Sequence, residues 1–133
     1  MILLDTHALI WMDADDPALG HKARGLIQQA WESGEVMVSA VTFWECTMLH
    51  ERKRIVLPLS VLGWREELLQ AGLGECPLDG ATAVLATQLN LPHQDPADCF
   101  IAACAIRMQA ILITADSRLL EWKGALKRQD ARS

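Results

Sequence analysis

Short apolar runs alternate along this chain with longer segments in which apolar residues recur every three or four positions. The runs at residues 2–4, 36–38 and 111–114 are uniformly apolar or nearly so, as in strands of a parallel sheet that are covered on both faces. The segments between them have the spacing of helices that bury one side. The alternation predicts a three-layer α/β/α fold with a central, mainly parallel sheet.

Capping residues predict where the helices begin. Asp95 followed by Pro96 has the pattern of an N-cap and a first-turn proline, with Asp98 at the third helical position. Similar signals predict helices from Asp16-Pro17 to near Gly34, after Ser39, from Pro58-Ser60 to about Gln70, from Asp79 to Leu89, and from Pro96 to about Met108. Residues 73–76 and 125–126 are predicted as shorter strands, and residues 91–94 as a loop.

The length and composition predict one domain. A chain of 133 residues with 51% hydrophobic residues supplies a single continuous core, so residues 1–133 are expected to form one domain. The mean hydropathy is positive, at +0.14, which predicts that another subunit covers some apolar surface. Because no apolar run approaches a membrane span and Asp5 comes too early for a signal peptide, we expect a cytoplasmic protein without a membrane segment.

The cysteines and histidines do not have metal-site spacing. Four cysteines lie in hydrophobic segments without a C-x-x-C pair, which predicts buried, reduced thiols. The histidines form no H-x-x-x-H pair, and no Cys/His spacing supports a zinc site, so surface or loop roles are expected. The histidines considered are His7, His50 and His93.

The net charge of −5 argues against a protein that coats nucleic acid, because phosphate binding depends on Lys and Arg. It does not exclude a nuclease, since an acidic metal site contributes to that charge. Local basic groups at residues 52–54 and 127–128 are interpreted either as contacts to a backbone or as solvated chain ends.

Four separated acidic residues follow or begin the strongest apolar elements: Asp5, Glu45, Asp98 and Asp116. In an α/β fold such positions gather at the carboxyl ends of the parallel strands. Carboxylates that meet in one crevice raise one another's pKa and are normally neutralised by a divalent cation. Each acid alone has a simpler interpretation as a cap, a turn residue or an exposed helical residue. The combination makes metal-dependent phosphodiester hydrolysis the leading hypothesis.

The sequences around these acids resemble the PIN-domain family in order and spacing. They are LDTHALIW at residues 4–11, SAVTFWE at 39–45, HQDPAD at 93–98 and ITAD at 113–116. More narrowly, the chain looks like a VapC-type toxin ribonuclease of a toxin–antitoxin pair, and the resemblance extends from Ile2 to about Trp122.

The resemblance implies a Mg²⁺ or Mn²⁺ site that hydrolyses RNA phosphodiesters without a nucleophilic side chain. Carried over by position, Asp5 and Asp98 are the principal metal ligands, and Glu45 and Asp116 bind the metal directly or through water, or orient the attacking water. The family also implies an RNA substrate, a cognate antitoxin partner and a homodimer. Which acid acts as general base stays open.

Residues next to the acids are candidates for supporting roles. Thr6 and Thr114 match hydroxyl positions near the family's site, where they would bond a ligand carboxylate or, alternatively, cap the backbone. Asp95 is expected to be a helix cap rather than a ligand. Many relatives carry Arg after the acid that corresponds to Asp98, whereas this chain has Cys99. A thiol cannot pair with phosphate, which places substrate positioning in question.

Three alternatives remain at this point. A haloacid-dehalogenase-like phosphatase would need a second Asp at the position of His7, and a receiver domain would need an acidic pair and a late Lys. A catalytically degenerate module that binds a partner without cutting RNA is the alternative motivated by Cys99.

The five tryptophans are expected in the core or at an interface, with base stacking as the other interpretation.

Overall fold

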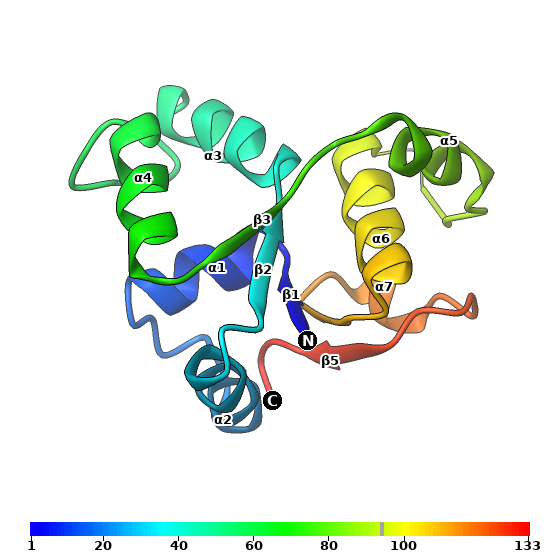
Figure 1. Cartoon of the computed structure of the whole chain (residues 1–133), viewed down its shortest axis with the longest axis horizontal. Helices are drawn as coiled ribbons and strands as arrows, with labels where there is room; N and C mark the ends of the chain where they lie inside the picture. Colours follow the sequence, from blue (N-terminus) through cyan, green and yellow to red (C-terminus); the bar gives the residue numbers. More distant parts are fainter. Residues whose placement is uncertain (94) are drawn as a thin grey trace.

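The computed structural model describes residues 1–93 and 95–133, in which strands and helices alternate along the chain (Figure 1). Gln94, the last residue of the predicted loop 91–94, lies outside the described residues. The strands are β1 (Ile2–Leu4), β2 (Val36–Ser39), β3 (Gly74–Cys76), β4 (Ile111–Thr114) and β5 (Arg128–Asp130). The helices are α1 (Thr6–Asp13), α2 (His21–Glu32), α3 (Val41–Glu51), α4 (Val61–Ala71), α5 (Gly80–Gln88), α6 (Pro96–Met108) and α7 (Ser117–Glu121).

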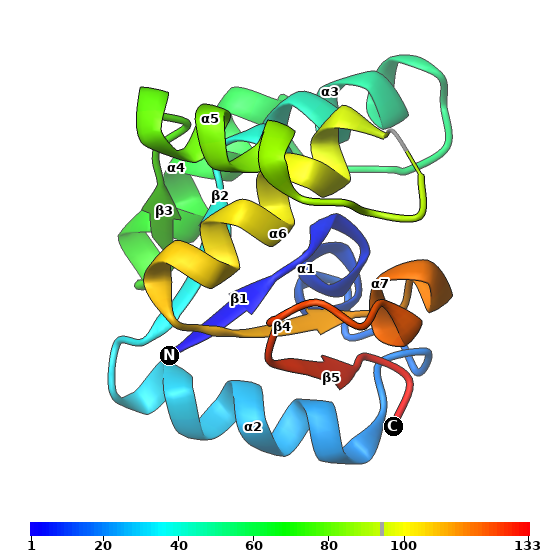
Figure 2. The ribbon, with the colours of Figure 1, turned by 90° about the vertical axis from the view of Figure 1, so that its right-hand side faces the viewer.

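The five strands form one sheet in the order β3-β2-β1-β4-β5, and every neighbouring pair is parallel (Figure 2). β1 is the central strand, and Leu4 at its end lies opposite Val38 on β2 and Ile113 on β4. Because all strands run the same way, their carboxyl ends share one edge of the sheet. The predicted parallel sheet is confirmed.

Side chains of the central strands alternate between two hydrophobic clusters, one on each face of the sheet. Ile2 and Leu4 belong to the cluster covered by α1, α2 and α4, whereas Leu3 belongs to the cluster under α6 and α7. α5 packs on α6, and α3 contributes to both clusters. The helices therefore form two layers around the sheet, as Figure 1 shows, and the predicted three-layer α/β/α fold is confirmed.

Most capping predictions hold. Asp95 caps α6, Asp79 caps α5 and Ser60 caps α4, each through its side chain. Two predicted boundaries are wrong. The last strand is β5 rather than residues 125–126, and α2 begins at His21 rather than at Asp16-Pro17. Asp16 instead accepts a hydrogen bond from the Ala18 amide at 2.8 Å, which closes a local turn.

The C-terminal residues explain the late start of α2. The Gly20 amide donates to the carbonyl of Ala131 at 2.8 Å, and the Lys22 amide donates to that of Ser133 at 2.8 Å. A Cβ atom on Gly20 would lie 2.4 Å from the carbonyl carbon of Arg132, so only glycine permits this approach. The tail thus docks on the first turn of α2 and is held beside the carboxyl end of the sheet.

The expectation of four reduced thiols is corrected for two of them. Cys76, at the end of β3, and Cys104, within α6, form a disulfide, while Cys46 is a buried free thiol and Cys99 a half-buried one. The sequence places the pair 28 residues apart, so only the tertiary fold brings them together.

Among the described residues, no helix is both long and apolar enough to cross a bilayer.

Candidate active site

Asp5 lies at the centre of the carboxyl edge, directly after β1. It is the N-cap of α1, and its Oδ1 accepts a hydrogen bond from the Ala8 amide at 3.1 Å. Its other carboxylate oxygen accepts a hydrogen bond from the hydroxyl of Thr114, the last residue of β4. Asp5 is only 8% exposed. Residues from two neighbouring strands thus fix the buried Asp5 carboxylate at the carboxyl edge of the sheet.

Glu45 reaches the same region from the second turn of α3. The hydroxyl of Thr6, the first residue of α1, donates to Glu45 Oε1 at 2.5 Å. α3 begins two residues after β2 ends, because Ser39 closes the connection with a hydrogen bond from the Val41 amide to its Oγ. This short connection places the second turn of α3 over the end of the sheet.

Asp98 and Asp116 complete the cluster from the other side. Asp98 lies in the first turn of α6, where its Oδ2 is 2.6 Å from Nε2 of His93. Asp116 follows β4 and caps α7 by accepting from the Arg118 amide at 2.8 Å. One ligating atom from each of His93, Asp98 and Asp116 lies within 4.8 Å of the other two.

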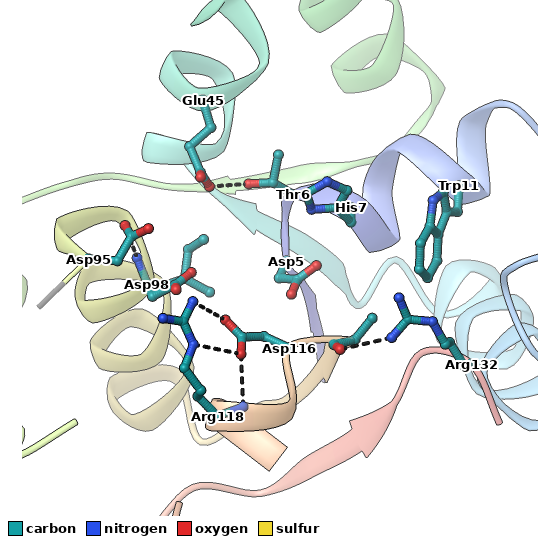
Figure 3. Close-up of a pocket in the computed structure, with 12 residues that line it drawn as sticks. Asp5, Thr6, His7, Trp11, Glu45, Asp95, Asp98, Asp116, Arg118 and Arg132 are labelled. Carbon is teal, nitrogen blue, oxygen red and sulfur yellow. Dashed lines mark hydrogen bonds and ion pairs between the residues drawn. The ribbon is translucent and has the colours of Figure 1, made fainter. Parts of the chain in front are cut away.

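One cleft brings together the four acids predicted from the sequence, Asp5, Glu45, Asp98 and Asp116 (Figure 3). Its other lining residues include Thr6, His7, Trp11, Asp95, Arg118 and Arg132. Asp95 also caps α6, since its Oδ1 accepts from the amides of Ala97 at 3.0 Å and Asp98 at 3.4 Å. Thr114 is buried beneath the cleft, bonded to Asp5.

Burial and repulsion between neighbouring carboxylates raise the pKa of three of these carboxyls. Burial raises the pKa of Asp5, although bonds from Thr114 and Ala8 oppose the shift. Burial also raises the pKa of Glu45 to about 7 and that of Asp98 to about 6, with added repulsion from neighbouring carboxylates. Such shifts mark a site where negative charge lacks a counter-ion.

The pKa of Asp116 shifts in the opposite direction, because the Arg118 guanidinium lies beside its carboxylate. Burial works to raise its pKa, but hydrogen bonds and charge from Arg118 outweigh it, so the pKa of Asp116 is lowered. The Arg118 Nη2 lies 3.4 Å from Asp116 Oδ2, and its side chain is 54% exposed. Figure 3 shows the Arg118 guanidinium beside the Asp116 carboxylate.

A family model described as PIN domain matches residues 2–124. The chain belongs to the PIN-domain family. It is 37% identical over 120 residues to Ribonuclease VapC22 of Mycobacterium tuberculosis (strain ATCC 25618 / H37Rv), a match that covers 89% of this chain and 88% of that protein. The predicted family and its VapC type are therefore confirmed.

Solved structures share the fold of this PIN domain. The DNA-bound VapBC complex of Salmonella typhimurium contains a chain that superposes with a TM-score of 0.71 at 18% identity, covering 97% of this chain and 96% of that one. A toxin–antitoxin complex from Klebsiella pneumoniae gives a TM-score of 0.65 at 17% identity, with 98% of each chain covered. At these identities the likeness establishes the fold.

The sequence did not predict the places of His93, Arg118 and Arg132, of which Arg118 and Arg132 line the cleft. His93 lies in a loop as expected, but not at the surface: its side chain is 10% exposed and contacts Asp98. His93 and Asp98 belong to the same motif, five residues apart, and this was the one sequence feature that could have indicated their contact. Arg118 and Arg132 had no such signal. Arg132 reaches the cleft from the docked tail, donates to the Ala115 carbonyl at 3.0 Å and lies 5.3 Å from the Trp11 ring centre.

Cys99, which stands where many relatives have Arg, lies outside the cleft. Its half-buried side chain packs with the hydrophobic cluster under α6 and does not line the cleft. Arg107 lies away from the site, where it binds Asp79 at 2.9 Å and Thr82 at 2.8 Å. Arg118, in contrast, lines the cleft. The cleft therefore contains an arginine from α7 although α6 does not supply one.

The donor set of this cleft suits a hard divalent cation. Carboxylate oxygens are the ligands that Mg²⁺ and Mn²⁺ prefer, and five acidic side chains line this cleft. Oxygens of two of them, Asp98 and Asp116, lie within 4.8 Å of each other. The pKa values of Glu45 and Asp98 are raised in the absence of a cation. A bound cation would lower them and favour the ionised carboxylates. The residues present therefore fit a divalent metal.

Proposed function

We propose that this PIN domain is a Mg²⁺- or Mn²⁺-dependent endoribonuclease that acts as the toxin of a type II toxin–antitoxin pair. The observation that carries the proposal is the meeting of Asp5, Glu45, Asp98 and Asp116 in one cleft at the carboxyl edge of the sheet. The family membership and the similarity to a protein named Ribonuclease VapC22 support it.

Asp5 and Asp98 would hold the metal, and Glu45 and Asp116 would complete its surroundings. When bound, the metal would activate water for attack and stabilise negative charge on the phosphate. The chain's own groups orient the ligands: Thr114 fixes Asp5, and Thr6 fixes Glu45. Such supporting hydrogen bonds restrict each carboxylate to one rotamer before the metal arrives.

His93 and Arg118 have separate tasks in this proposal. The 2.6 Å contact between His93 and Asp98 fixes the position of that carboxylate. Arg118 keeps Asp116 ionised and leaves much of its own guanidinium exposed to the cleft. An exposed guanidinium beside a metal site is suited to an RNA phosphate, because its planar donors match phosphate oxygens.

The partners follow from the same family assignment. We infer that residues 1–133 act as one nuclease domain in the cytoplasm, as a homodimer, and that a cognate antitoxin inhibits it. The neighbours of the fold from Salmonella and Rickettsia felis are described as VapBC complexes bound to DNA, which supports an antitoxin partner. Inhibition is expected from a cationic antitoxin side chain that reaches the carboxylates.

A catalytically degenerate module is less well supported. It was motivated by Cys99, yet the cleft keeps all four acids and gains Arg118 from α7. No observation among the described residues favours loss of activity.

Cleavage of total RNA and transfer RNA by the purified, partner-free protein tests the proposal. Discrete cuts are expected in Mg²⁺ or Mn²⁺, and both EDTA and Asp98→Asn should abolish them. Asp79→Asn is the matched control, because Asp79 caps α5 and pairs with Arg107 outside the cleft. A folded protein that binds metal but cuts neither RNA preparation would overturn the ribonuclease assignment.

A further inference from the structure

A second hollow adjoins the catalytic cleft and shares one residue with it. Arg118 lines both, and the second hollow is completed by Asn90, Pro92, Glu121, Trp122 and Lys123. A chain that leaves the carboxylate cluster past Arg118 therefore enters a region with an aromatic ring and a second cation. Neither the family motifs nor the carboxylate chemistry assigns a role to this hollow.

The indole of Trp122 is held in one orientation. Its Nε1 donates to the carbonyl of Asn90 at 2.9 Å, which ties α7's end to the loop before α6. A Cβ atom on Gly124 would lie 2.1 Å from Cη2 of Trp122, so the backbone of Gly124 lies directly against the ring. Trp122 also packs against the cluster under α6 while staying half-buried. The ring is thus both fixed and accessible.

Basic residues outnumber acidic ones in the lining of this hollow, although the whole chain carries a net charge of −5. The lining contains Arg118 and Lys123 against the single acid Glu121. Lys123 is exposed next to Trp122, and Arg118 is 54% exposed between the two hollows. Two cations that flank a fixed aromatic ring suit a polyanion whose monomers carry flat bases.

We propose that the hollow formed by Trp122, Lys123 and Arg118 is a binding subsite for one nucleotide of single-stranded RNA next to the cleaved phosphate. Its base stacks on Trp122, and its phosphates contact Arg118 and Lys123. The proposal rests on the proposed ribonuclease function and adds to it the path that the strand takes. Continuity through Arg118 and charge complementarity identify RNA as the occupant.

Binding of a 5′-fluorescein-labelled uridine dodecamer, measured by fluorescence anisotropy, tests this subsite. Ca²⁺ replaces Mg²⁺, and gel electrophoresis confirms that the RNA stays intact. Trp122→Leu should weaken binding about 5- to 150-fold, the range for loss of one stacked base. Trp122→Phe keeps an aromatic face and should recover most of the affinity. Lys123→Gln should reduce the slope of log K against log salt by about 0.7, as for one lost phosphate contact on a single strand.

Two matched variants serve as controls. Trp31→Leu removes a half-buried indole that lines a different hollow, on α2, and Lys127→Gln removes a nearby lysine that faces another depression beside α6. Neither should change RNA binding. If the wild type binds and cuts RNA but the Trp122 and Lys123 variants bind it unchanged, the subsite is refuted and the ribonuclease assignment survives. If the folded wild type neither binds nor cuts RNA, both proposals fail.

Discussion

Thr114 on β4 donates a hydrogen bond to the buried carboxylate of Asp5, which directly follows the neighbouring strand β1. The bond spans 109 residues of sequence but only one strand spacing of the sheet. It opposes the rise that burial produces in the pKa of Asp5. The same hydroxyl accepts from the Asp116 amide at 3.1 Å. One side chain thus connects two of the four acids.

Thr114→Val should weaken both the fold and the metal site. Valine keeps the shape but removes one of the two hydrogen-bond donors to the buried Asp5 carboxylate, which costs about 1–3 kcal/mol of the free energy of unfolding. The affinity for Mn²⁺ should fall about 10- to 100-fold, as when other groups that orient metal ligands are removed. Urea unfolding and calorimetry measure the two effects.

Thr47→Val is the control for that change. Thr47 Oγ1 donates to the Phe43 carbonyl at 2.7 Å within α3, away from the cleft. Its loss should leave Mn²⁺ affinity unaltered. Equal Mn²⁺ affinity in Thr114→Val and the wild type would show that Thr114 does not orient a ligand.

The metal-free protein should lose stability as the pH rises from about 5 to 8. The pKa of Glu45 is about 7 and that of Asp98 about 6 in the fold, whereas both groups titrate near 4 in an unfolded chain. Between these values the folded state binds more protons than the unfolded state. The free energy of unfolding must therefore fall with pH across this window.

Mg²⁺ should reverse this trend, because it favours the ionised carboxylates that repel one another without it. Thermal unfolding with and without Mg²⁺ at pH 5.5 and 7.5 is expected to show the larger metal stabilisation at pH 7.5. Glu45→Gln, which has no carboxyl to ionise, should flatten the metal-free profile. A metal-free protein that becomes more stable between these pH values would contradict the pKa assignments.

Arg118→Gln should reduce RNA cleavage mainly through KM. Its guanidinium is exposed in the cleft and pairs with Asp116 at 3.4 Å, so its removal takes away a phosphate contact but no metal ligand. The difference between variant and wild type should shrink at high salt, where phosphate contacts contribute less. Arg107→Gln, which removes an arginine outside the cleft, should leave KM unchanged. An unaltered KM in Arg118→Gln would exclude a role in substrate binding.

Gln109→Gly should stabilise the protein without changing cleavage. Gln109 ends α6 in the left-handed conformation, with φ of 52°, which costs a side-chain-bearing residue about 1 kcal/mol. Arg52→Gly at the end of α3, where φ is −85°, lacks this benefit and should be destabilising or neutral. Thermal unfolding checks the prediction: the melting temperature of Gln109→Gly should lie above that of the wild type, and that of Arg52→Gly should not.

The strands and the position of the acids were predictable because their signals are local. Three apolar runs, each followed by an acid or by a helix bearing one, specify parallel strands whose ends meet. The start of α6 at Pro96 was predicted to the residue, since Asp95 and Pro96 combine the strongest helix-start signals. In contrast, the five residues of α7 are too few to show a helical period.

The remaining features depend on tertiary contacts that no local pattern encodes. Arg132 joins the cleft because the tail docks on Gly20, more than a hundred residues away in sequence. His93 turns inward because its loop lies against Asp98. The Cys76–Cys104 disulfide needs β3 and α6 to lie together on the sheet. Sequence reasoning treated the histidines and cysteines by spacing alone, and therefore missed both contacts.

Titration calorimetry of Mn²⁺ into the metal-free protein tests most directly the central claim that four carboxylates form one divalent-cation site. The wild type and Asp79→Asn should bind Mn²⁺ alike, because Asp79 lies outside the cleft. Asp5→Asn and Asp98→Asn, with circular dichroism confirming their fold, should lose nearly all binding. Wild-type Mn²⁺ affinity in both folded cleft variants would contradict the account.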